Sequence, residues 1–351
     1  DDNLVDLASN DYLGLSTNKT LFQNAYENIL KEKYHSPKAS MLVNGYSKIH
    51  KKFEDRLCEV NGFEAGVIVG SGFLANISMI EALCRKNDTL FIDEEYHASG
   101  ILATKLLRPE QVIIFNHNDF KDLEKKISTN QRTGRNIIAI EGVYSMGGDL
   151  APIEIFQIAD EKKSILIVDE AHSFGVIGDN LLGIFDYYKI KPTQYHVKMG
   201  TLGKAYGSYG AYILASKQII DFLINRAKPI IYSTAPSLFD TALANESLDY
   251  IIENKDLLKE KIKNNLTIIK NILGLNSQSL IIPILIGDNK KVKKIQENLK
   301  QNGFLVGAIR QPTVKEAIIR LIAKIDINEN NLTKICNLIK DSNVNKWLNK
   351  R

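Results

Sequence analysis

Short, strongly apolar runs alternate along the chain with longer segments in which apolar residues recur at helical spacing. The apolar runs predict buried strands at 64–69, 89–93, 111–115, 136–141 and 164–169. The helical spacing predicts helices at 73–84, 97–107, 119–128 and 152–162. Strands that alternate with helices in this way form a mainly parallel sheet with helices on both faces.

A further apolar run begins at His196 and breaks into closely spaced glycines at Gly200, Gly203 and Gly207. The next apolar run, 208–215, follows after too few residues for a helical crossover. We therefore expect this strand to lie antiparallel to its neighbour. With it, the sheet has seven strands.

The two ends of the chain have a different pattern. Helices are predicted at 20–33 and 48–61, and a long helical stretch covers 236–272. Beyond it we expect strands at 279–287, 304–309 and 317–324, with helices at 291–302 and 329–340. The α/β fold then divides into a large domain, 36–235, and a smaller α+β domain formed by 1–35 and 236–351.

Composition agrees with a globular enzyme and excludes several other classes. The 351 residues are 44% hydrophobic and 25% charged, and the net charge of +4 is spread along the chain. Lysines are frequent in 255–300 but are mixed with acidic residues, which favours a solvated helix face over a nucleic-acid site. No apolar run is long enough to span a membrane. Three distant cysteines fit neither a disulfide framework nor a metal site, so we expect a cytoplasmic protein.

Candidate chemistry gathers around Lys204, which stands among the glycines after the His196 run. Upstream, Asp169 and His172 follow the apolar strand 164–169. A lysine amine, a carboxylate at a strand end and a histidine near a ring are the parts of a pyridoxal phosphate site. Lys204 alone would be interpreted as a surface residue, but together with Asp169 and His172 it favours a site for pyridoxal phosphate.

A second candidate site lies earlier, where Gly70-Ser-Gly joins a strand to a helix. Such a helix start presents backbone N–H groups to an anion. The stretch Gly70-Ser-Gly-Phe-Leu-Ala also fits the dinucleotide fingerprint, with Asp93 placed to bind a ribose. A nucleotide-binding oxidoreductase stays open on this evidence, although it accounts for neither Lys204 nor Asp169.

Several motifs, in order and over almost the whole chain, carry a family resemblance. They are Ala8-Ser-Asn-Asp-Tyr-Leu-Gly-Leu-Ser, Ser71-Gly-Phe, Tyr96-His-Ala-Ser, Glu141-Gly-Val-Tyr-Ser-Met, Asp169-Glu-Ala-His, Gly200-Thr-Leu-Gly-Lys, Ile231-Tyr-Ser-Thr and Gly307-Ala-Ile-Arg-Gln-Pro-Thr-Val. With these motifs the chain resembles the α-oxoamine synthases, a family of fold-type I pyridoxal phosphate transferases. The resemblance is strongest to the alanine-condensing members that serve biotin biosynthesis.

The resemblance implies roles for particular residues. Lys204 would hold pyridoxal phosphate as a Schiff base, and Asp169 would pair with the pyridine nitrogen. His97 would stack on the ring, while His172 and Ser145 would bond the region of the phenolic oxygen. The phosphate would be bound by Gly72, Phe73 and Thr201, and by Thr234 of the partner subunit in a homodimer. The substrate would be contacted by Arg310 and Thr313.

The implied reaction is a decarboxylative condensation of L-alanine with a pimeloyl thioester carried by coenzyme A or acyl carrier protein. Two alternatives stay open: a family member that uses glycine or serine with another acyl-CoA, and a non-catalytic subunit of a heterodimeric synthase. The loop 35–41 departs from the family because it lacks a glycine-rich run ending in arginine.

Overall fold

The computed structural model describes residues 3–342, which form two compact units. The large unit comprises 16–144 and 150–252, and the described residues of the small unit are 3–15, 145–149 and 253–342. The outermost residues of the expected small domain, 1–2 and 343–351, lie outside the described residues. Among the described residues, no helix is long and apolar enough to cross a membrane.

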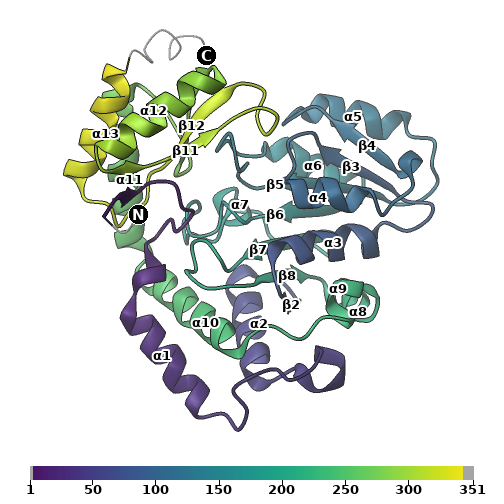
Figure 1. Ribbon diagram of the computed structural model, residues 1–351. Coiled ribbons are helices and arrows are strands. Elements are labelled where there is room, and N and C mark those ends of the chain that lie inside the picture. Colours follow the sequence, from purple (N-terminus) through teal and green to yellow (C-terminus); the bar gives the residue numbers. More distant parts are fainter. Residues whose placement is uncertain (1–2, 343–351) are drawn as a thin grey trace. The chain divides into compact units, whose positions relative to one another are not determined.

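A seven-stranded sheet forms the centre of the large unit (Figure 1). Its strands stand in the order β2-β8-β7-β6-β5-β3-β4. Only β8 runs antiparallel to its neighbours, β2 and β7, as the short connection after Lys204 predicts. The strand bounds are β2 (Ala65–Val69), β3 (Thr89–Asp93), β4 (Val112–Phe115), β5 (Asn136–Glu141), β6 (Ile165–Asp169), β7 (His196–Thr201) and β8 (Ala211–Ala215).

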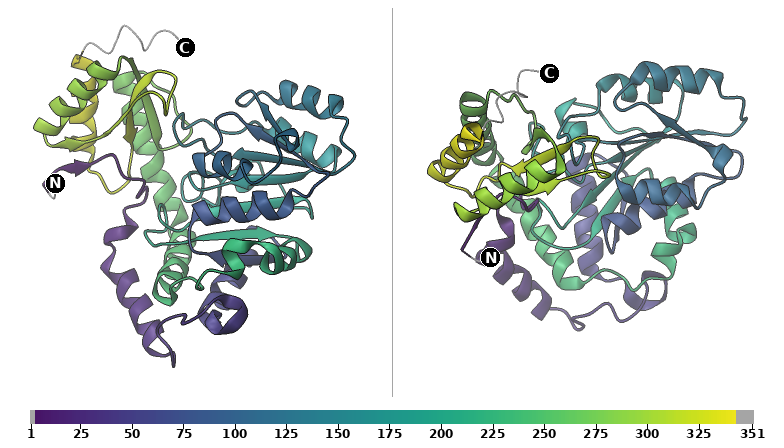
Figure 2. Two further views of the ribbon diagram at one scale, coloured as in Figure 1. Left: turned by 45° about the vertical axis from the view of Figure 1, so that its right-hand side comes forward. Right: turned by 45° about the horizontal axis from the view of Figure 1, so that its top comes forward.

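Helices cover both faces of this sheet because alternate strand residues are apolar on each side (Figure 2). On β7, Val197 and Met199 join the core under α3, whereas His196 packs near Phe156 and Phe185 on the other face. The first face carries α3 (Gly72–Leu83), α4 (Ala98–Thr104), α8 (Lys217–Arg226) and α9 (Lys228–Ile231). The second carries α2 (Lys48–Asn61), α5 (Phe120–Thr129), α6 (Ile153–Glu161) and α7 (Ile184–Tyr187). Short helical turns lie at η1 (Leu15–Thr17), η2 (Met41–Gly45) and η3 (Pro109–Gln111).

The compact units place their boundaries differently from the expected ranges 36–235, 1–35 and 236–351. Helices α1 (Lys19–Leu30) and α10 (Leu238–Glu253) group with the large unit. They contact each other, since the Asn28 amide donates to Glu246 over 3.0 Å and the rings of Phe22 and Phe239 lie 4.9 Å apart. The stretch predicted as one helix over 236–272 is interrupted at Asn254, where α11 (Lys255–Leu273) begins.

The small unit is an α+β arrangement. An antiparallel sheet has the order β11-β12-β9, and β1 pairs in parallel with β10. The predicted strand 304–309 is therefore two strands in two different sheets. The bounds are β1 (Val5–Asp6), β9 (Ile281–Gly287), β10 (Phe304–Leu305), β11 (Gly307–Ile309) and β12 (Ala317–Ile322), with helices α11, α12 (Asn289–Gln301) and α13 (Glu329–Asp341).

Candidate active site

Two neighbouring strands bring the predicted residues to one edge of the large sheet. Asp169 is the last residue of β6 and Thr201 is the last residue of β7, and these strands run parallel. Lys204 follows in a tight loop, where the Gly207 N–H donates to the Lys204 carbonyl over 3.0 Å. Gly207 has a φ of +61°, which an L-residue rarely adopts. The carboxyl edge of parallel strands is where α/β sheets bind ligands.

The Lys204 amine contacts one of the predicted histidines. Its Nζ lies 2.8 Å from Nε2 of His172, which belongs to the turn after β6. His172 is buried, whereas Lys204 is half-buried. A half-buried amine held by a hydrogen bond at a sheet edge is accessible to a ligand and has a defined direction.

Asp169 is a buried carboxylate with two neutral donors. Its Oδ1 accepts from the backbone N–H of Ala171 over 3.0 Å, and its Oδ2 accepts from the Asn76 amide over 2.9 Å. The residue is 4% exposed. Neutral donors fix the carboxylate without neutralising it, so it can still pair with a cationic ring nitrogen.

His97 caps the start of α4 and forms part of the same cluster. Its Nδ1 lies 2.7 Å from Oγ of Ser99 and accepts from the Ser99 N–H over 3.2 Å. Desolvation of the imidazole lowers the pKa of His97; the Asp169 carboxylate opposes this change and the Lys204 ammonium adds to it. The structure thus brings together Lys204, His172, Asp169 and His97.

The predicted phosphate residues form a second group at this edge. Gly72 and Phe73 are the first two residues of α3, so their N–H groups have no acceptor within the helix. A Cβ atom at Gly72 would lie 3.8 Å from Cβ of Thr201, which makes these residues neighbours. The Thr201 hydroxyl donates to the Gly210 carbonyl over 3.2 Å and accepts from the Gly203 N–H over 3.4 Å. Amide groups, a hydroxyl and a helix N-terminus are suitable ligands for a phosphate.

The other predicted residues lie elsewhere. Thr234 is an exposed residue of the large unit, between α9 and α10. Ser145, Arg310 and Thr313 belong to the small unit. There the Ser145 carbonyl accepts from Arg320 Nε over 2.7 Å, and the exposed Arg310 accepts through its carbonyl from the Thr313 N–H over 3.0 Å. The roles implied for these four residues stay predictions.

Three site residues were not assigned from the sequence: Asn76, Tyr96 and Ser99. Asn76 donates to Asp169, and the Tyr96 hydroxyl donates to the Asn76 carbonyl oxygen over 2.7 Å. The available signal was the polar Asn76 within the mostly apolar helix 73–84, one turn beyond Gly72.

The oxidoreductase alternative fails at Asp93. Its carboxylate is fully buried and already accepts from the N–H groups of Glu95 and Asn118, over 2.8 and 2.9 Å. The His117 ring also lies 3.0 Å from it. A carboxylate occupied in this way does not reach a ribose.

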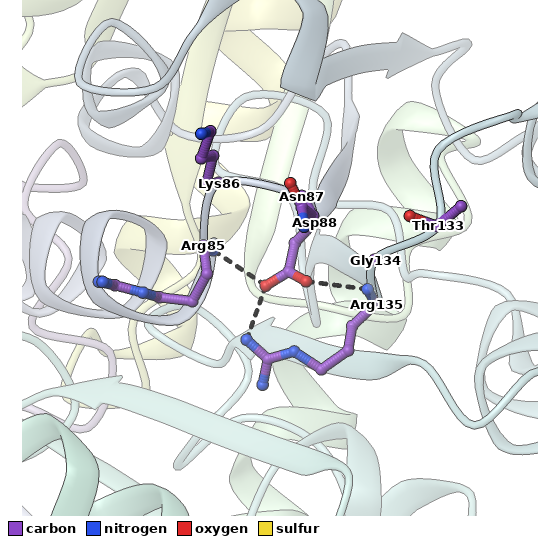
Figure 3. A pocket seen from close by; sticks show the side chains of 7 residues that line it. All are labelled: Arg85, Lys86, Asn87, Asp88, Thr133, Gly134 and Arg135. Carbon is purple, nitrogen blue, oxygen red and sulfur yellow. Dashed lines mark hydrogen bonds and ion pairs between the residues drawn. The ribbon is translucent and has the colours of Figure 1, made fainter.

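A hollow of about 520 Å³ lies at the opposite edge of the sheet, next to the amino ends of β3 and β5 (Figure 3). Asp88 there accepts from Arg135 Nη2 over 2.6 Å and from the Arg85 N–H over 2.9 Å. Burial alone would raise the pKa of Asp88, but the hydrogen bonds from Arg135 and Arg85 hold it below its ordinary value. These contacts make this edge a structural junction of loops.

Comparison with known proteins shows the family to which the chain belongs. The family model described as aminotransferase class I and II matches residues 2–339. A relative from Helicobacter pylori strain J99, named 8-amino-7-oxononanoate synthase, is 46% identical over 339 residues, which cover 96% of this chain and 91% of the relative.

Two solved structures are similar in fold. A structure of serine palmitoyltransferase with PLP has a TM-score of 0.90 at 21% identity, over 97% of this chain and 87% of the other. The 8-amino-7-oxononanoate synthase of Francisella tularensis has a TM-score of 0.82 at 24% identity, over 99% of this chain and 100% of the other. The likeness confirms the predicted fold, that of a fold-type I transferase. The chain belongs to the aminotransferase class I and II family and, within it, to the family of the 8-amino-7-oxononanoate synthases.

Proposed function

We propose that the protein is a pyridoxal phosphate-dependent acyltransferase that joins L-alanine to a pimeloyl thioester with loss of carbon dioxide. The products are 8-amino-7-oxononanoate and the free thiol, in biotin biosynthesis. The observation that carries this proposal is the Lys204 amine, 2.8 Å from His172, at the sheet edge that also carries Asp169. The relative with 46% identity is named for the same product.

The donor set of the site fits pyridoxal phosphate. Lys204 offers an amine to an aldehyde, Asp169 offers a buried carboxylate to a ring nitrogen, and α3 offers N–H groups to a phosphate. When bound, the cofactor supplies an electron sink that tolerates negative charge at the α-carbon of an amino acid.

The chain's own residues perform the remaining tasks. Asp169 keeps a proton on the pyridine nitrogen, because an ionised carboxylate in a low-dielectric site favours the cation beside it. The Lys204 amine removes the α-proton of alanine, and the neighbouring His172 directs that amine. Gly72, Phe73 and Thr201 bind the phosphate, and His97 covers the ring.

A homodimer completes the proposed enzyme. Exposed apolar side chains recur every fourth residue on α1, at Phe22, Tyr26 and Leu30, and Val43 is 78% exposed in η2. Such a surface is typical of an interface. Mixing Lys204→Ala with Thr234→Ala subunits should restore part of the activity, because one of the two sites in each heterodimer is then intact. Heterodimers without activity would show that Thr234 does not complete the partner's site.

The thioester is carried by coenzyme A or acyl carrier protein, and both carriers contain phosphate. A hollow of about 620 Å³ in the large unit is lined by Lys33, Lys38, Lys48 and Lys51, with Tyr34 beside them. Glu32 also lines this hollow and Lys51 pairs with Asp55, but the four lysines outnumber the two acidic residues, so the hollow keeps a net positive charge. This charge supports a phosphate-bearing carrier.

The proposed location is the cytoplasm. Cys58, Cys84 and Cys336 are all free thiols, as expected in a reducing compartment. Burial raises the pKa of each thiol to about 12, so none is a reactive thiolate at neutral pH.

The cofactor assignment is tested by chemical trapping. The purified protein should be yellow, and borohydride should fix pyridoxal phosphate on Lys204, as identified by peptide mass spectrometry. The matched control is Lys217→Met, which removes an exposed lysine at the start of α8 and should still be labelled at Lys204. A colourless protein without affinity for the cofactor, or a label on another lysine, would refute the assignment.

A further inference from the structure

A chain of hydrogen bonds joins His97 to Asp169 inside the large unit. The Tyr96 hydroxyl donates to Asn76 Oδ1 over 2.7 Å. Asn76 Nδ2 donates to Asp169 Oδ2 and to Ser99 Oγ, each over 2.9 Å. Ser99 Oγ lies 2.7 Å from His97 Nδ1. Except for His97, these residues are all buried, so each polar atom depends on its partner.

The Asp169 carboxylate determines which group donates in each hydrogen bond of this network. An ionised carboxylate only accepts, so the amide group that faces Asp169 is the NH₂ of Asn76. The carbonyl oxygen of Asn76 then faces Tyr96, whose hydroxyl donates to it. The second proton of the NH₂ group goes to Ser99 Oγ, which leaves the Ser99 hydroxyl proton to be donated onward.

The onward acceptor is the imidazole of His97. The backbone N–H of Ser99 also points at His97 Nδ1, over 3.2 Å. Two donors at one ring nitrogen require a lone pair there, so the proton of the neutral ring is on Nε2.

We propose that Asn76 and Ser99 are positioning residues that hold His97 as the tautomer protonated at Nε2 and tie it to the Asp169 carboxylate. This inference rests on the proposed function only for its meaning. The residue that covers the cofactor ring and the residue that protonates its nitrogen both depend on Asn76 of α3, which bonds Asp169 directly and reaches His97 through Ser99 of α4. A ring without a proton on Nδ1 presents a defined Nε2–H to the site. The charged groups that act on His97 are Asp169 and Lys204. The other members of the hydrogen-bond network, Asn76, Ser99 and the Tyr96 phenol, are neutral.

Nitrogen NMR of the full chain labelled with ¹⁵N-histidine reads the tautomer directly. Spectra are recorded with and without pyridoxal phosphate, and His97 is assigned by its loss in His97→Asn. At pH 7.5 both forms of the wild-type protein should show an unprotonated Nδ1 and a protonated Nε2 for His97. A protonated Nδ1 in either form overturns the proposal, whether or not any variant folds.

Variants separate positioning from general stability. Ser99→Ala should give a mixture of tautomers and weaken cofactor binding by roughly tenfold, as expected for the loss of one hydrogen bond near a charge. Ser99→Thr retains the hydroxyl and should restore both properties. The control Ser78→Ala removes a different buried hydroxyl, on α3, that donates only to the Leu74 carbonyl within the helix, and should change neither.

The outcome for Ser99 is independent of the outcome for the proposed function. If the protein bound no pyridoxal phosphate, the proposed function would fail while the tautomer could still be measured. If Ser99→Ala kept the wild-type His97 spectrum and cofactor affinity, the positioning role would be refuted while the proposed function stood.

Discussion

Glu54 should make the protein less stable as the pH rises through neutrality. Its carboxyl group lies between α2 and β2, accepts from the Ile68 N–H over 3.0 Å and is contacted by the Tyr46 hydroxyl. The residue is 7% exposed. Burial raises its pKa from 4.5 to about 7, and the hydrogen bonds from Tyr46 and Ile68 only partly oppose this change.

The sign and size of the effect follow from the two pKa values. Between pH 4.5 and about 7 the unfolded chain loses the Glu54 proton while the folded chain keeps it, so folding becomes less favourable. One pKa unit is worth about 1.4 kcal/mol, so the whole window costs about 3 kcal/mol of unfolding free energy, most of it between pH 5 and pH 8. Above pH 8 both states are ionised and the effect ends.

The assay is urea unfolding at pH 5 and pH 8, compared with Glu54→Gln, which is neutral at both values. The wild-type free energy of unfolding should fall by about 2 to 3 kcal/mol more than that of the variant. The control Glu59→Gln changes an exposed carboxyl of the same helix, in a surface ion pair with Arg56, and should follow the wild type. Equal pH dependence in wild type and Glu54→Gln would refute a buried, protonated Glu54.

Three further predictions concern the site and its support. Asp169→Asn should still be trapped by borohydride on Lys204, but exchange of the alanine α-proton should slow by at least about 100-fold, or roughly 2.7 kcal/mol of barrier; exchange at the parent rate with cofactor bound would exclude Asp169 as the pyridinium partner. Glu170→Ala should lower the free energy of unfolding by about 3 to 5 kcal/mol, because it leaves the buried Lys198 ammonium, 3.4 Å away, without its counter-ion. The double variant Glu170→Ala with Lys198→Met should recover part of this loss. An unchanged denaturation midpoint in Glu170→Ala would show that the ion pair does not stabilise the fold. Lys38→Met with Lys48→Met should raise KM for the acyl thioester about tenfold at unchanged kcat, whereas Lys52→Met, outside that hollow, should not; equal KM values would mean that the carrier binds elsewhere.

The positions of Asp169 and Thr201 at strand ends could be predicted from the sequence because apolar runs indicate where strands end. Asp169 and Thr201 are the last residues of β6 and β7, and parallel neighbours bring their ends to one edge. Lys204 then follows from its distance to Thr201 and from the glycines around it. The antiparallel β8 was predictable for the same reason, since a short connection allows no crossover.

Contacts between elements were not predictable in this way. The apolar spacing of α1 and α10 reveals buried faces but not that each helix lies against the other. For this reason the boundaries of the compact units differ from the domain boundaries expected from the sequence. Helices α8 and α9 follow β8 in a stretch for which the apolar pattern gave no element. The hydrogen bond from Asn76 to Asp169 joins residues 93 positions apart, and no local pattern indicates such a pair.

Turnover by the loaded enzyme tests the central claim most directly. The purified protein with pyridoxal phosphate is given L-alanine and a pimeloyl thioester, and the product is identified by mass spectrometry beside parallel reactions with glycine and serine. We predict 8-amino-7-oxononanoate and carbon dioxide, with alanine the best of the three amino acids and no product from Lys204→Ala. Faster turnover of glycine or serine, or cofactor-loaded protein that forms no product from alanine, would contradict the proposed function.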